Sequence, residues 1–509
     1  MLSRSAPRVR SRDFYSLFRS ACLQQIRLHG QSTASPRIFP PTINELAAAP
    51  LPEDEVTVTG WVRTVRKLKN VAFASVNDGS SGANMQVVLK HDQLEGLTTG
   101  TSVQITGRYE QSTKGKGQQD RELKASNVQV LGASDGETYP MQKKYHGAEH
   151  LRQNAHLRPR TSSTSALLRL RSKTMSALNN FFDTQSFTQT HPPILTSSDC
   201  EGAGEVFSIS TSTSSPKGAK DKGGFFGHST YLTVSTQLHL EALAHGLGRV
   251  WCVCPAFRAE TSLTNRHLAE FWMLEAEVAF VREQGELMTL TEEMIRHVAK
   301  GLLENPTAAA ELAPYASPTA EGNDTKIDLP SRWRGLARDN WTRMSYTTAV
   351  NHLQHAVSTN LTSFKFPPIW GHALQSEHEK WLAGEFVKGP VFVHDYPASL
   401  KPFYMLPSLP SNTVSEGATV ACFDLLVPEM GELVGGSLRQ HDAAALESQI
   451  EKAGMKAEEM AWYVELRKWG SVPHGGFGMG FDRFLAYLGG VENLREVVAF
   501  PRWAKHCKF

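Results

Sequence analysis

Several features are missing from this 509-residue sequence, and each absence excludes a class of protein. No stretch of about 18 consecutive apolar residues occurs, which argues against a membrane-spanning helix. No GK[ST] sequence occurs, so a Walker phosphate loop is excluded. The six cysteines form no CxxC pair and have no zinc-like spacing, and this composition fits a reducing compartment.

Two of the cysteines, Cys252 and Cys254, lie in the alternating segment Arg-Val-Trp-Cys-Val-Cys. In a strand they would point to the same face, where cysteine packs as a small hydrophobic residue. Metal binding is the alternative, and their spacing favours packing.

Lysine is absent from the first 40 residues, and Asp13 is the only acid there. Seven arginines give this segment a net charge of +6, which leaves −4 for the remainder of a chain whose total is +2. A segment rich in arginine and serine and poor in acids is typical of an organellar transit peptide. We expect residues 1–35 to direct import into the mitochondrial matrix. The alternative is a basic tail that contacts nucleic acid.

Short alternating segments separated by turn residues predict five strands within residues 50–133. Five strands in about 80 residues suit an oligonucleotide-binding (OB) barrel. Near the first turn, basic side chains stand close to an aromatic ring, Phe73, on which a base could stack. The alternative is a solvated, charged hairpin. The basic residues are Arg63, Arg66, Lys67 and Lys69.

The rest of the chain mixes helices and strands, so we expect an α+β protein. Residues 134–164 read as a loop-like hinge before a catalytic domain over residues 165–509. At the start of that domain, apolar residues fall on one helical face, and the segment His191–Leu195 is extended because residues before proline avoid the α region. Residues 211–224 and 305–324 read as surface loops. The apolar residues are Leu167, Leu170, Leu178, Phe181 and Phe182.

Two arginines, a histidine and two acids flank a loop in the segment Phe257–Glu277. Guanidinium groups orient phosphate oxygens with paired hydrogen bonds, and a phenylalanine offers a flat surface to a nucleotide base. The segment therefore indicates a nucleotide-triphosphate site, although a salt-bridged hairpin is the alternative. The residues concerned are Arg258, Glu260, Arg266, His267, Glu270 and Phe271.

A second segment, Gly475–Arg483, reads as a glycine-rich turn that opens an apolar helix. Glycine lets backbone approach a ligand, and a helix N-terminus favours anions. Arg483 would then face the site from the first turn. Alone, such a turn is more often structural than catalytic.

Together these segments resemble motifs 2 and 3 of the class II aminoacyl-tRNA synthetases, and Leu167–Leu195 resembles motif 1, their dimer-interface helix and strand. A barrel ahead of the catalytic domain is similar to the aspartyl, asparaginyl and lysyl subgroup. Within it, Arg266–Glu277 resembles the asparaginyl-tRNA synthetases. The similarity runs from about Val56 to Phe509. It implies an N-terminal OB barrel and a catalytic domain with an antiparallel sheet flanked by helices.

The resemblance also implies roles for particular side chains, with ATP as substrate and Mg²⁺ as cofactor. Arg258 and Arg483 would be catalytic. The implied ATP-binding set is Arg258, Glu260, His267, Phe271, Glu432 and Arg483, and Glu432 and Asp424 would hold Mg²⁺. The implied asparagine-binding set is Glu201, Gln237, Glu275 and Arg439. In the barrel, Phe73 and Gln86 would contact the anticodon of tRNA(Asn).

The choice of amino acid depends on one position. Aspartyl enzymes resemble Gln-x-x-Lys where this chain has Gln237-Leu238-His239-Leu240, so Leu240 stands in place of a lysine. Removing that cation while retaining Glu275 disfavours a carboxylate side chain and suits an amide. The resemblance therefore predicts asparagine, tRNA(Asn) and a homodimer. An aspartyl enzyme, an asparagine-forming ligase and a non-enzymatic RNA-binding paralogue are the alternatives.

Overall fold

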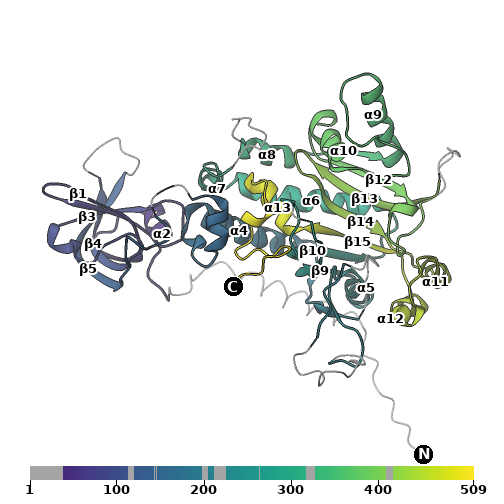
Figure 1. The fold of residues 1–509 in the computed structure, drawn as a ribbon, viewed down its shortest axis with the longest axis horizontal. Coiled ribbons are helices and arrows are strands. Elements are labelled where there is room, and N and C mark those ends of the chain that lie inside the picture. The colour runs from purple at the N-terminus through teal and green to yellow at the C-terminus, as the bar shows by residue number, and fades with distance from the viewer. Residues whose placement is uncertain are drawn as a thin grey trace, which may run out of the picture. The chain divides into compact units, whose positions relative to one another are not determined.

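The computed structural model divides the chain into two compact units (Figure 1). The first ends at Ala133 and the second runs from Ser134 to Phe509, and the second also includes two short loops, Ser81–Asn84 and Thr98–Gly100. The predicted transit peptide, Glu201 and the insert 211–224 lie outside the described residues. The described residues are 38–112, 120–142, 144, 146–197, 205–210, 225–262, 264–316, 327–408 and 417–509.

The first unit is a closed five-stranded barrel of order β1-β2-β3-β5-β4, which confirms the predicted OB fold. Along its strands buried and half-exposed residues alternate, because successive side chains of a strand point to opposite faces. A short helix closes one part of the core with Ile43 and Leu46. The elements are α2 (Ile43–Ala48), β1 (Val56–Lys67), β2 (Ala72–Asn77), β3 (Met85–Leu89), η2 (His91–Leu94), β4 (Ser102–Gln111) and β5 (Arg121–Gly132).

An eight-stranded sheet of order β11-β12-β13-β14-β15-β10-β9-β6 organises the second unit. Its six inner strands are antiparallel, as predicted, whereas both edge strands pair in parallel with their neighbours. The sheet is therefore mixed. Its strands are β6 (Thr188–Gln189), β9 (Arg249–Phe257), β10 (Glu270–Ala279), β11 (Thr342–Ser345), β12 (Val391–Pro397), β13 (Thr419–Val427), β14 (Gly431–Leu438) and β15 (His474–Gly480), and β7 (Leu195–Thr196) pairs separately with β8 (Tyr231–Leu232).

Helices cover both faces of this sheet (Figure 1). Along β12, Phe392 belongs to one apolar core, whereas Val391 and Val393 belong to another, so the two cores lie on opposite faces. The helices are α3 (Ala148–Gln153), η3 (Arg158–Arg160), α4 (Ser162–Thr184), α5 (Gln237–Leu247), α6 (Gln284–Leu303), α7 (Pro306–Leu312), α8 (Leu329–Leu336), α9 (Tyr346–Ser358), α10 (Ser376–Trp381), η4 (Leu382–Phe386), η5 (Ala398–Leu400), α11 (Ala443–Lys452), α12 (Ala457–Lys468), α13 (Phe481–Gly489) and η6 (Leu494–Glu496).

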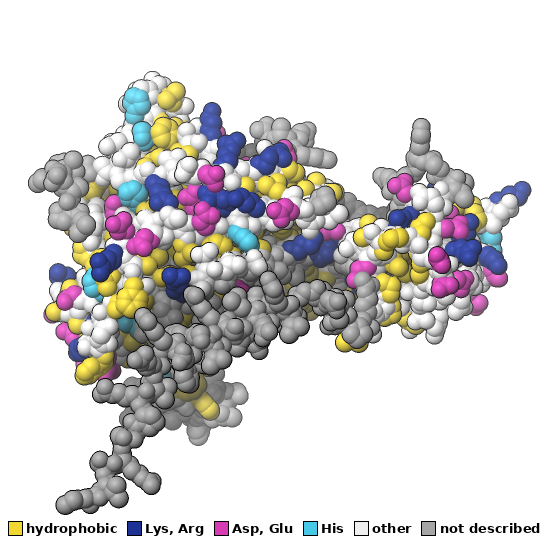
Figure 2. All heavy atoms as spheres, turned by 180° about the vertical axis from the view of Figure 1, so that it is seen from behind, with side chains coloured by type: hydrophobic (Ala, Val, Ile, Leu, Met, Phe, Trp, Pro, Cys, Tyr) yellow, Lys and Arg dark blue, Asp and Glu magenta, His cyan; other side chains and the backbone are white. Residues whose placement is uncertain are grey.

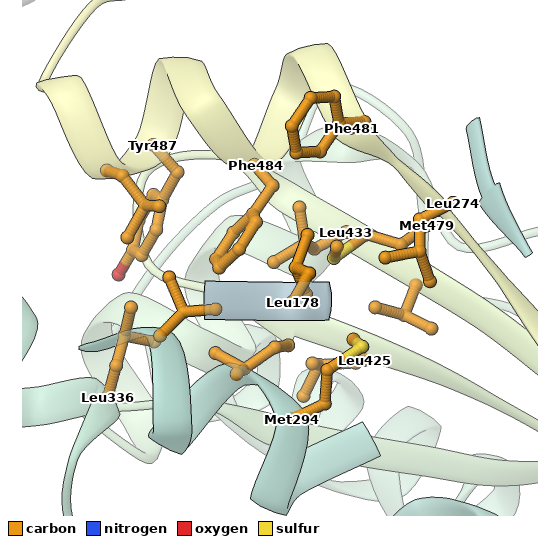
Figure 3. Close-up of a cluster of buried hydrophobic side chains, with 14 of the residues drawn as sticks. Leu178, Leu274, Met294, Leu336, Leu425, Leu433, Met479, Phe481, Phe484 and Tyr487 are labelled. Atoms are coloured by element: carbon orange, nitrogen blue, oxygen red, sulfur yellow. The ribbon is translucent and has the colours of Figure 1, made fainter. Parts of the chain in front are cut away.

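The larger core joins α4, α6, α8 and α13 to one face of the sheet. Figure 3 shows Phe484 of α13 directed toward Leu178 of α4, and Phe481 of α13 and Leu433 of the sheet belong to the same core. All five apolar residues predicted to share a face of the first long helix are buried, which confirms that prediction. The side chain of Thr161 caps this helix by accepting from the N–H of Thr164. Burial of this face fixes α4 beside the strands that carry the site.

Two segments differ from their prediction as loops. Within residues 134–164 the chain forms α3 and η3, and the side chain of Arg158 is fully buried. Within residues 305–324 the first part is α7, and Ala308 and Leu312 are buried. The reading of 305–312 as a surface loop was wrong because Asn305 caps a run of good helix formers. Residues 317–326 lie outside the described part.

Acidic and basic side chains lie interspersed on the face of the molecule shown in Figure 2. Among the described residues, no helix combines the length and the apolar character that crossing a bilayer requires.

Candidate functional site: a charged cleft on the central sheet

Four of the six predicted nucleotide-binding residues lie on β10 or in the loop that joins β9 to it, namely Arg258, Glu260, His267 and Phe271. The Arg258 guanidinium lies 5.6 Å from the centroid of the Phe271 ring. Glu260 joins this group, with Oε2 3.1 Å from His267 Nε2 and Oε1 4.0 Å from Arg258 Nη1. These charged side chains stay partly exposed, and they line a cavity of about 160 Å³ together with Arg483. A flat ring beside two arginines suits a nucleotide and its phosphates.

The glycine-rich segment was predicted to be a turn, and that prediction is wrong. Residues 474–480 form β15, which pairs with both β10 and β14 at the middle of the sheet. Gly476 is required by its close neighbours, since an added Cβ would lie 2.0 Å from Glu277 Oε2 and 2.2 Å from the carbonyl oxygen of Ala276. At Gly478 it would lie 3.0 Å from Met273 Cε. Missing side chains along this strand leave room above the sheet for a ligand.

The helix predicted to follow the glycines does begin there, at Phe481. Arg483 lies in the first turn, as expected, and its Nη1 donates to the carbonyl oxygen of Glu432 at 3.4 Å. The preceding residue, Asp482, accepts from Arg171 of α4 at 2.6 Å and from the N–H of Trp272 at 2.8 Å. This buried carboxylate therefore ties α13 to α4 and β10, and it holds Arg483 over the nucleotide cavity.

Three carboxylates lie close enough to influence one another electrostatically: Asp424, Glu432 and Glu379. Burial, together with the neighbouring Glu432 and Asp424 carboxylates, raises the pKa of Glu379 to about 7. Burial and Asp424 likewise raise the pKa of Glu432. Carboxylates that resist ionisation together need a cation, and oxygen ligands beside phosphates suit Mg²⁺. One cation is already present, since Lys401 Nζ lies 2.7 Å from Asp424 Oδ2.

The described residues that were predicted to bind an amino acid line a second cavity, of about 220 Å³. In it, Glu275 is buried, and three neutral donors hold its carboxylate: the Ser235 hydroxyl at 2.5 Å, the Thr236 N–H at 2.9 Å and the Thr236 hydroxyl at 2.5 Å. Leu240 also lines this cavity, and it packs on the buried Cys252. Both predicted cysteines are buried in that apolar cluster, which confirms their role as small hydrophobic residues.

Arg439 enters the same cavity from the end of β14. Its Nε and Nη2 donate to the two oxygens of Glu277 at 3.2 and 3.0 Å, and its Nη1 donates to the Ser437 hydroxyl at 2.6 Å. A guanidinium has five N–H donors, so two are left for a ligand after these contacts. Although burial alone would lower it, Glu277 and Glu241 raise the pKa of Arg439, which is therefore a cation.

A buried polar network lies beneath this cavity. Glu241 of α5 accepts from Arg467 Nη2 at 2.6 Å and from the Tyr463 hydroxyl at 2.7 Å, and His474 Nε2 lies 3.1 Å away. Glu241, Glu277 and His474 bring potential metal-ligand atoms within 4.8 Å of one another. The positive charge among them comes from Arg439 and Arg467. The floor of the amino-acid cavity is thus a saturated network of charged groups.

The cleft is continuous along the sheet. Glu432 lines the amino-acid cavity, the nucleotide cavity and a third cavity of about 260 Å³ that extends beyond it toward α8 and α10. Arg266, His267 and Arg483 line both of the last two. The structure therefore brings together every predicted site residue of the second unit that it describes.

On the barrel, the predicted residues Phe73 and Gln86 share one outer face. Phe73 of β2 pairs with Arg66 of β1, and Gln86 of β3 pairs with Ser75. Both side chains are half-buried, and they alternate with the core residues of their strands. Gln86 Nε2 donates to Glu122 at 2.9 Å. The face thus combines an aromatic ring, a cation and an amide, which suits single-stranded nucleic acid.

Comparison with known proteins agrees with both halves of this architecture. A family described as tRNA synthetases class II (D, K and N) matches residues 148–504, and an OB-fold nucleic acid binding domain matches residues 56–131. The asparagine--tRNA ligase of Desulfotalea psychrophila is 44% identical over 466 residues, covering 90% of this chain and 98% of that protein. The chain belongs to the asparaginyl-tRNA synthetase family.

Other members of the asparaginyl-tRNA synthetase family support this placement. The mitochondrial asparagine--tRNA ligase of Saccharomyces cerevisiae is 43% identical, covering 88% of this chain and 92% of that protein. A crystal structure of asparaginyl-tRNA synthetase from Pyrococcus horikoshii complexed with asparaginyl-adenylate superimposes with a TM-score of 0.77 at 27% identity, covering 92% of this chain and all of that one. The class II fold and the asparagine--tRNA ligase family are thereby established for this chain.

Several polar residues of the cleft were missed from the sequence. Lys401 and Glu379 stand beside the predicted metal ligands, and Glu241 and Glu277 stand behind Arg439. Glu277 carried a signal, because it follows Glu275 by two residues and shares its face of a strand. The other three come from helices or loops that only the tertiary structure brings to the sheet. The expected Glu201 lies outside the described residues.

Proposed function

We propose that the chain uses ATP to join asparagine to tRNA(Asn) for mitochondrial translation. The observation that carries this proposal is the single cleft in which Arg258, Arg483 and Phe271 adjoin a cavity containing Arg439 and Glu275. A nucleotide and a small amino acid could therefore meet end to end beside Glu432. The activity of the family members and the adenylate bound to the Pyrococcus horikoshii enzyme are consistent with this arrangement.

The reaction needs no nucleophile from the protein. A carboxylate oxygen of asparagine attacks the α-phosphorus of ATP, the bond from that phosphorus to the bridging oxygen breaks, and pyrophosphate leaves. A terminal ribose hydroxyl of the tRNA then attacks the carbonyl carbon of the adenylate; AMP leaves, and the hydroxyl proton is released. Arg258 and Arg483 contribute by positioning the reactants and stabilising the charge that develops on phosphate oxygens.

In the proposed nucleotide site, Phe271 and Arg483 sandwich adenine, His267 and Arg483 contact the outer phosphates, and Glu260 lies near the adenine or the tRNA end. Glu432 and Asp424 would hold Mg²⁺, and their buried, mutually repelling carboxylates fit a hard cation. Bound there, Mg²⁺ would neutralise phosphate charge. Lys401 contacts Asp424 at 2.7 Å, so binding through that carboxylate requires the lysine to share it.

In the proposed amino-acid site, Arg439 donates to the side-chain carbonyl oxygen of asparagine. Gln237, Glu275 and Glu201 surround the ammonium and amide groups. Leu240 supplies no charge where an aspartate site needs a second cation. The barrel face around Phe73 and Gln86 would bind the anticodon, and α4 with its following strand would join two copies into a homodimer.

The decisive experiment is ATP–pyrophosphate exchange measured with asparagine and aspartate in parallel. We expect exchange to depend on asparagine, and aminoacylation to depend on tRNA(Asn). Stronger stimulation by aspartate would overturn the choice of amino acid, and the absence of exchange with either would favour a non-enzymatic RNA-binding role.

The proposed location in the mitochondrial matrix has its own test. It is supported by the arginine-rich, acid-poor residues 1–35 and by the mitochondrial name of the Saccharomyces cerevisiae relative. Fusion of residues 1–35 to a fluorescent protein should direct it to mitochondria, and a diffuse signal would contradict the assignment.

A further inference from the structure

Glu241 lies directly beneath the amino-acid cavity and contacts two of the side chains that line it. Gln237 Nε2 donates to Glu241 Oε1 at 3.1 Å, and Arg439 Nε lies 3.8 Å from the same oxygen. The Glu241 side chain itself is fully buried, and the described lining of the cavity does not include it. It can therefore influence a bound amino acid only through Gln237 and Arg439.

The rest of its surroundings shows that Glu241 is an anion shared among several donors. On the side away from the cavity it accepts from Arg467 and Tyr463, and it faces His474. Burial alone would raise the pKa of Glu241, but Arg467 and His474 hold it well below its usual range. Two guanidinium groups, Arg439 and Arg467, thus face two carboxylates, Glu241 and Glu277.

We propose that Glu241 is a positioning residue that sets the selection of asparagine over aspartate, by reducing the attraction of Arg439 for a second carboxylate. This inference rests on the proposed function and extends it to a residue that touches no substrate. The amide oxygen of asparagine needs the N–H donors of Arg439 but little of its net charge, whereas the carboxylate of aspartate gains from every uncompensated positive charge. A second buried anion behind Arg439 therefore penalises aspartate selectively.

The contact with Gln237 has a separate consequence. A carboxylate only accepts hydrogen bonds, so the Gln237 amide nitrogen faces Glu241 and its carbonyl oxygen is left for the cavity. That oxygen can accept from the α-ammonium group, which asparagine and aspartate have in common. Loss of this orientation should raise KM for both amino acids equally. Loss of the charge should change the ratio of their kcat/KM values.

The test is Glu241→Gln in the full-length chain, with ATP–pyrophosphate exchange measured for asparagine and for aspartate. Glutamine has nearly the same shape but removes one negative charge beside Arg439. We expect the ratio of kcat/KM for asparagine over aspartate to fall at least about tenfold, equivalent to about 1.4 kcal/mol. KM for ATP should stay unchanged, because the nucleotide residues lie elsewhere in the cleft.

Glu292→Gln is the matched control. Glu292 is a buried carboxylate of the same unit that pairs with Arg296 and Arg343, and it lines none of the described ligand cavities. The substitution removes the same single negative charge as Glu241→Gln. It should leave the ratio of kcat/KM for asparagine over aspartate unchanged, whatever its effect on stability.

A charge-restoring variant guards against misfolding of the single substitution. In the double variant Glu241→Gln, Arg467→Met one anion and one cation are removed together, so the ratio should return to within about threefold of the unmodified chain, a difference below 1 kcal/mol. If Glu241→Gln alone does not fold, the same one-charge step is measured between Arg467→Met and the double variant, and the ratio should again fall about tenfold across that step.

The outcomes separate the two proposals. An unaltered ratio in a variant that still exchanges, or an equal fall in the Glu292→Gln control, would overturn the role of Glu241 and leave the proposed function intact. Absence of asparagine-dependent exchange in the unmodified chain would overturn both.

Discussion

The two halves of the cleft hold their charges in opposite ways. In the nucleotide half, the side chains of Arg258 and His267 are 31% and 37% exposed, and both contact Glu260. In the amino-acid half, Arg439 and Glu277 are 4% and 1% exposed and share a bidentate contact. One half presents charges to solvent, and the other compensates them within the protein.

This difference follows from what each ligand brings. ATP carries several negative charges, so cations that wait partly hydrated gain a strong interaction when it binds. An asparagine side chain carries no charge, so an unpaired cation facing it would mainly attract the wrong ligand. Compensation inside the protein also removes the cost of leaving a buried charge unpaired. The contrast leads to four expectations, of which the first tests it most severely.

Removing one partner of the buried pair should be costly for folding. We expect Glu277→Gln to lower the free energy of unfolding by about 3–5 kcal/mol, because it leaves the Arg439 guanidinium buried with an incomplete counter-charge. Urea denaturation measures the loss. The matched change in the nucleotide half, Glu260→Gln, should cost no more than about 1 kcal/mol, since its contacts are partly exposed. Equal losses for the two variants would remove the contrast.

In the nucleotide half, a substitution should reduce activity strongly and change stability little. We expect Arg258→Ala to reduce ATP–pyrophosphate exchange to near background, because a lost preorganised cation raises the barrier by about 3–4 kcal/mol. Stability should change little, since the Arg258 side chain is partly exposed. Arg334→Ala, at a side chain that is 61% exposed, is the control and should exchange normally. Near-normal exchange by Arg258→Ala would refute its assignment.

The carboxylate cluster between the halves should make stability depend on pH when no metal is present. The pKa of Glu379 is raised from 4.5 to about 7, so the native state keeps a proton that the unfolded state releases near pH 4.5. In EDTA, this contribution should be complete below about pH 4.5 and be lost as pH rises to about 7, a decrease of about 3 kcal/mol.

Thermal melts of the unmodified chain and of Glu379→Gln would measure that contribution. The variant should lack the decrease between pH 4.5 and 7, and Mg²⁺ should restore stability of the unmodified chain most at the higher pH. Identical pH profiles for the two chains would rule out Glu379 as the group responsible.

The smallest effect is expected on the barrel, which should act on tRNA and leave the cleft untouched. Phe73→Ala should raise KM for tRNA(Asn) about tenfold, because the loss of one stacked base costs about 1–3 kcal/mol. Pyrophosphate exchange, which needs no tRNA, should remain normal. Phe225→Ala, at a side chain that is 75% exposed on the second unit, serves as a control. A fall in exchange with Phe73→Ala would mean that the substitution disturbs more than the barrel face.

Sequence patterns predicted the elements of this fold better than the contacts between them. Alternation in the barrel strands and the apolar face of α4 were read correctly because each depends on neighbours a few residues away. The glycines of β15 were read as a turn, since glycine is unfavourable in strands. Only the neighbouring strand β10 explains why none but glycine fits at Gly476, because the Glu277 side chain and the Ala276 carbonyl oxygen leave no room for a Cβ.

The site shows the same division. Arg258 and Phe271 were found because they flank one hairpin, and Arg483 because it opens a helix after a glycine run. Glu241 gave no signal: it stands on a helix among apolar neighbours, and its partners Tyr463 and Arg467 lie on α12, more distant in the chain than any local pattern reaches. The positions of charged groups buried beneath the site depend on the tertiary structure, so local sequence patterns do not predict them.

The position of β15 in the chain has a consequence for how the protein is made. This strand lies in the interior of the sheet, between β10 and β14, yet it is the last strand of the chain to be synthesised. At about 5–20 residues per second, β10 leaves the ribosome on the order of ten seconds or more before its partner exists. A nascent chain in that interval has an open apolar strand edge in the middle of its future core, so completion of the sheet has to wait for the end of translation.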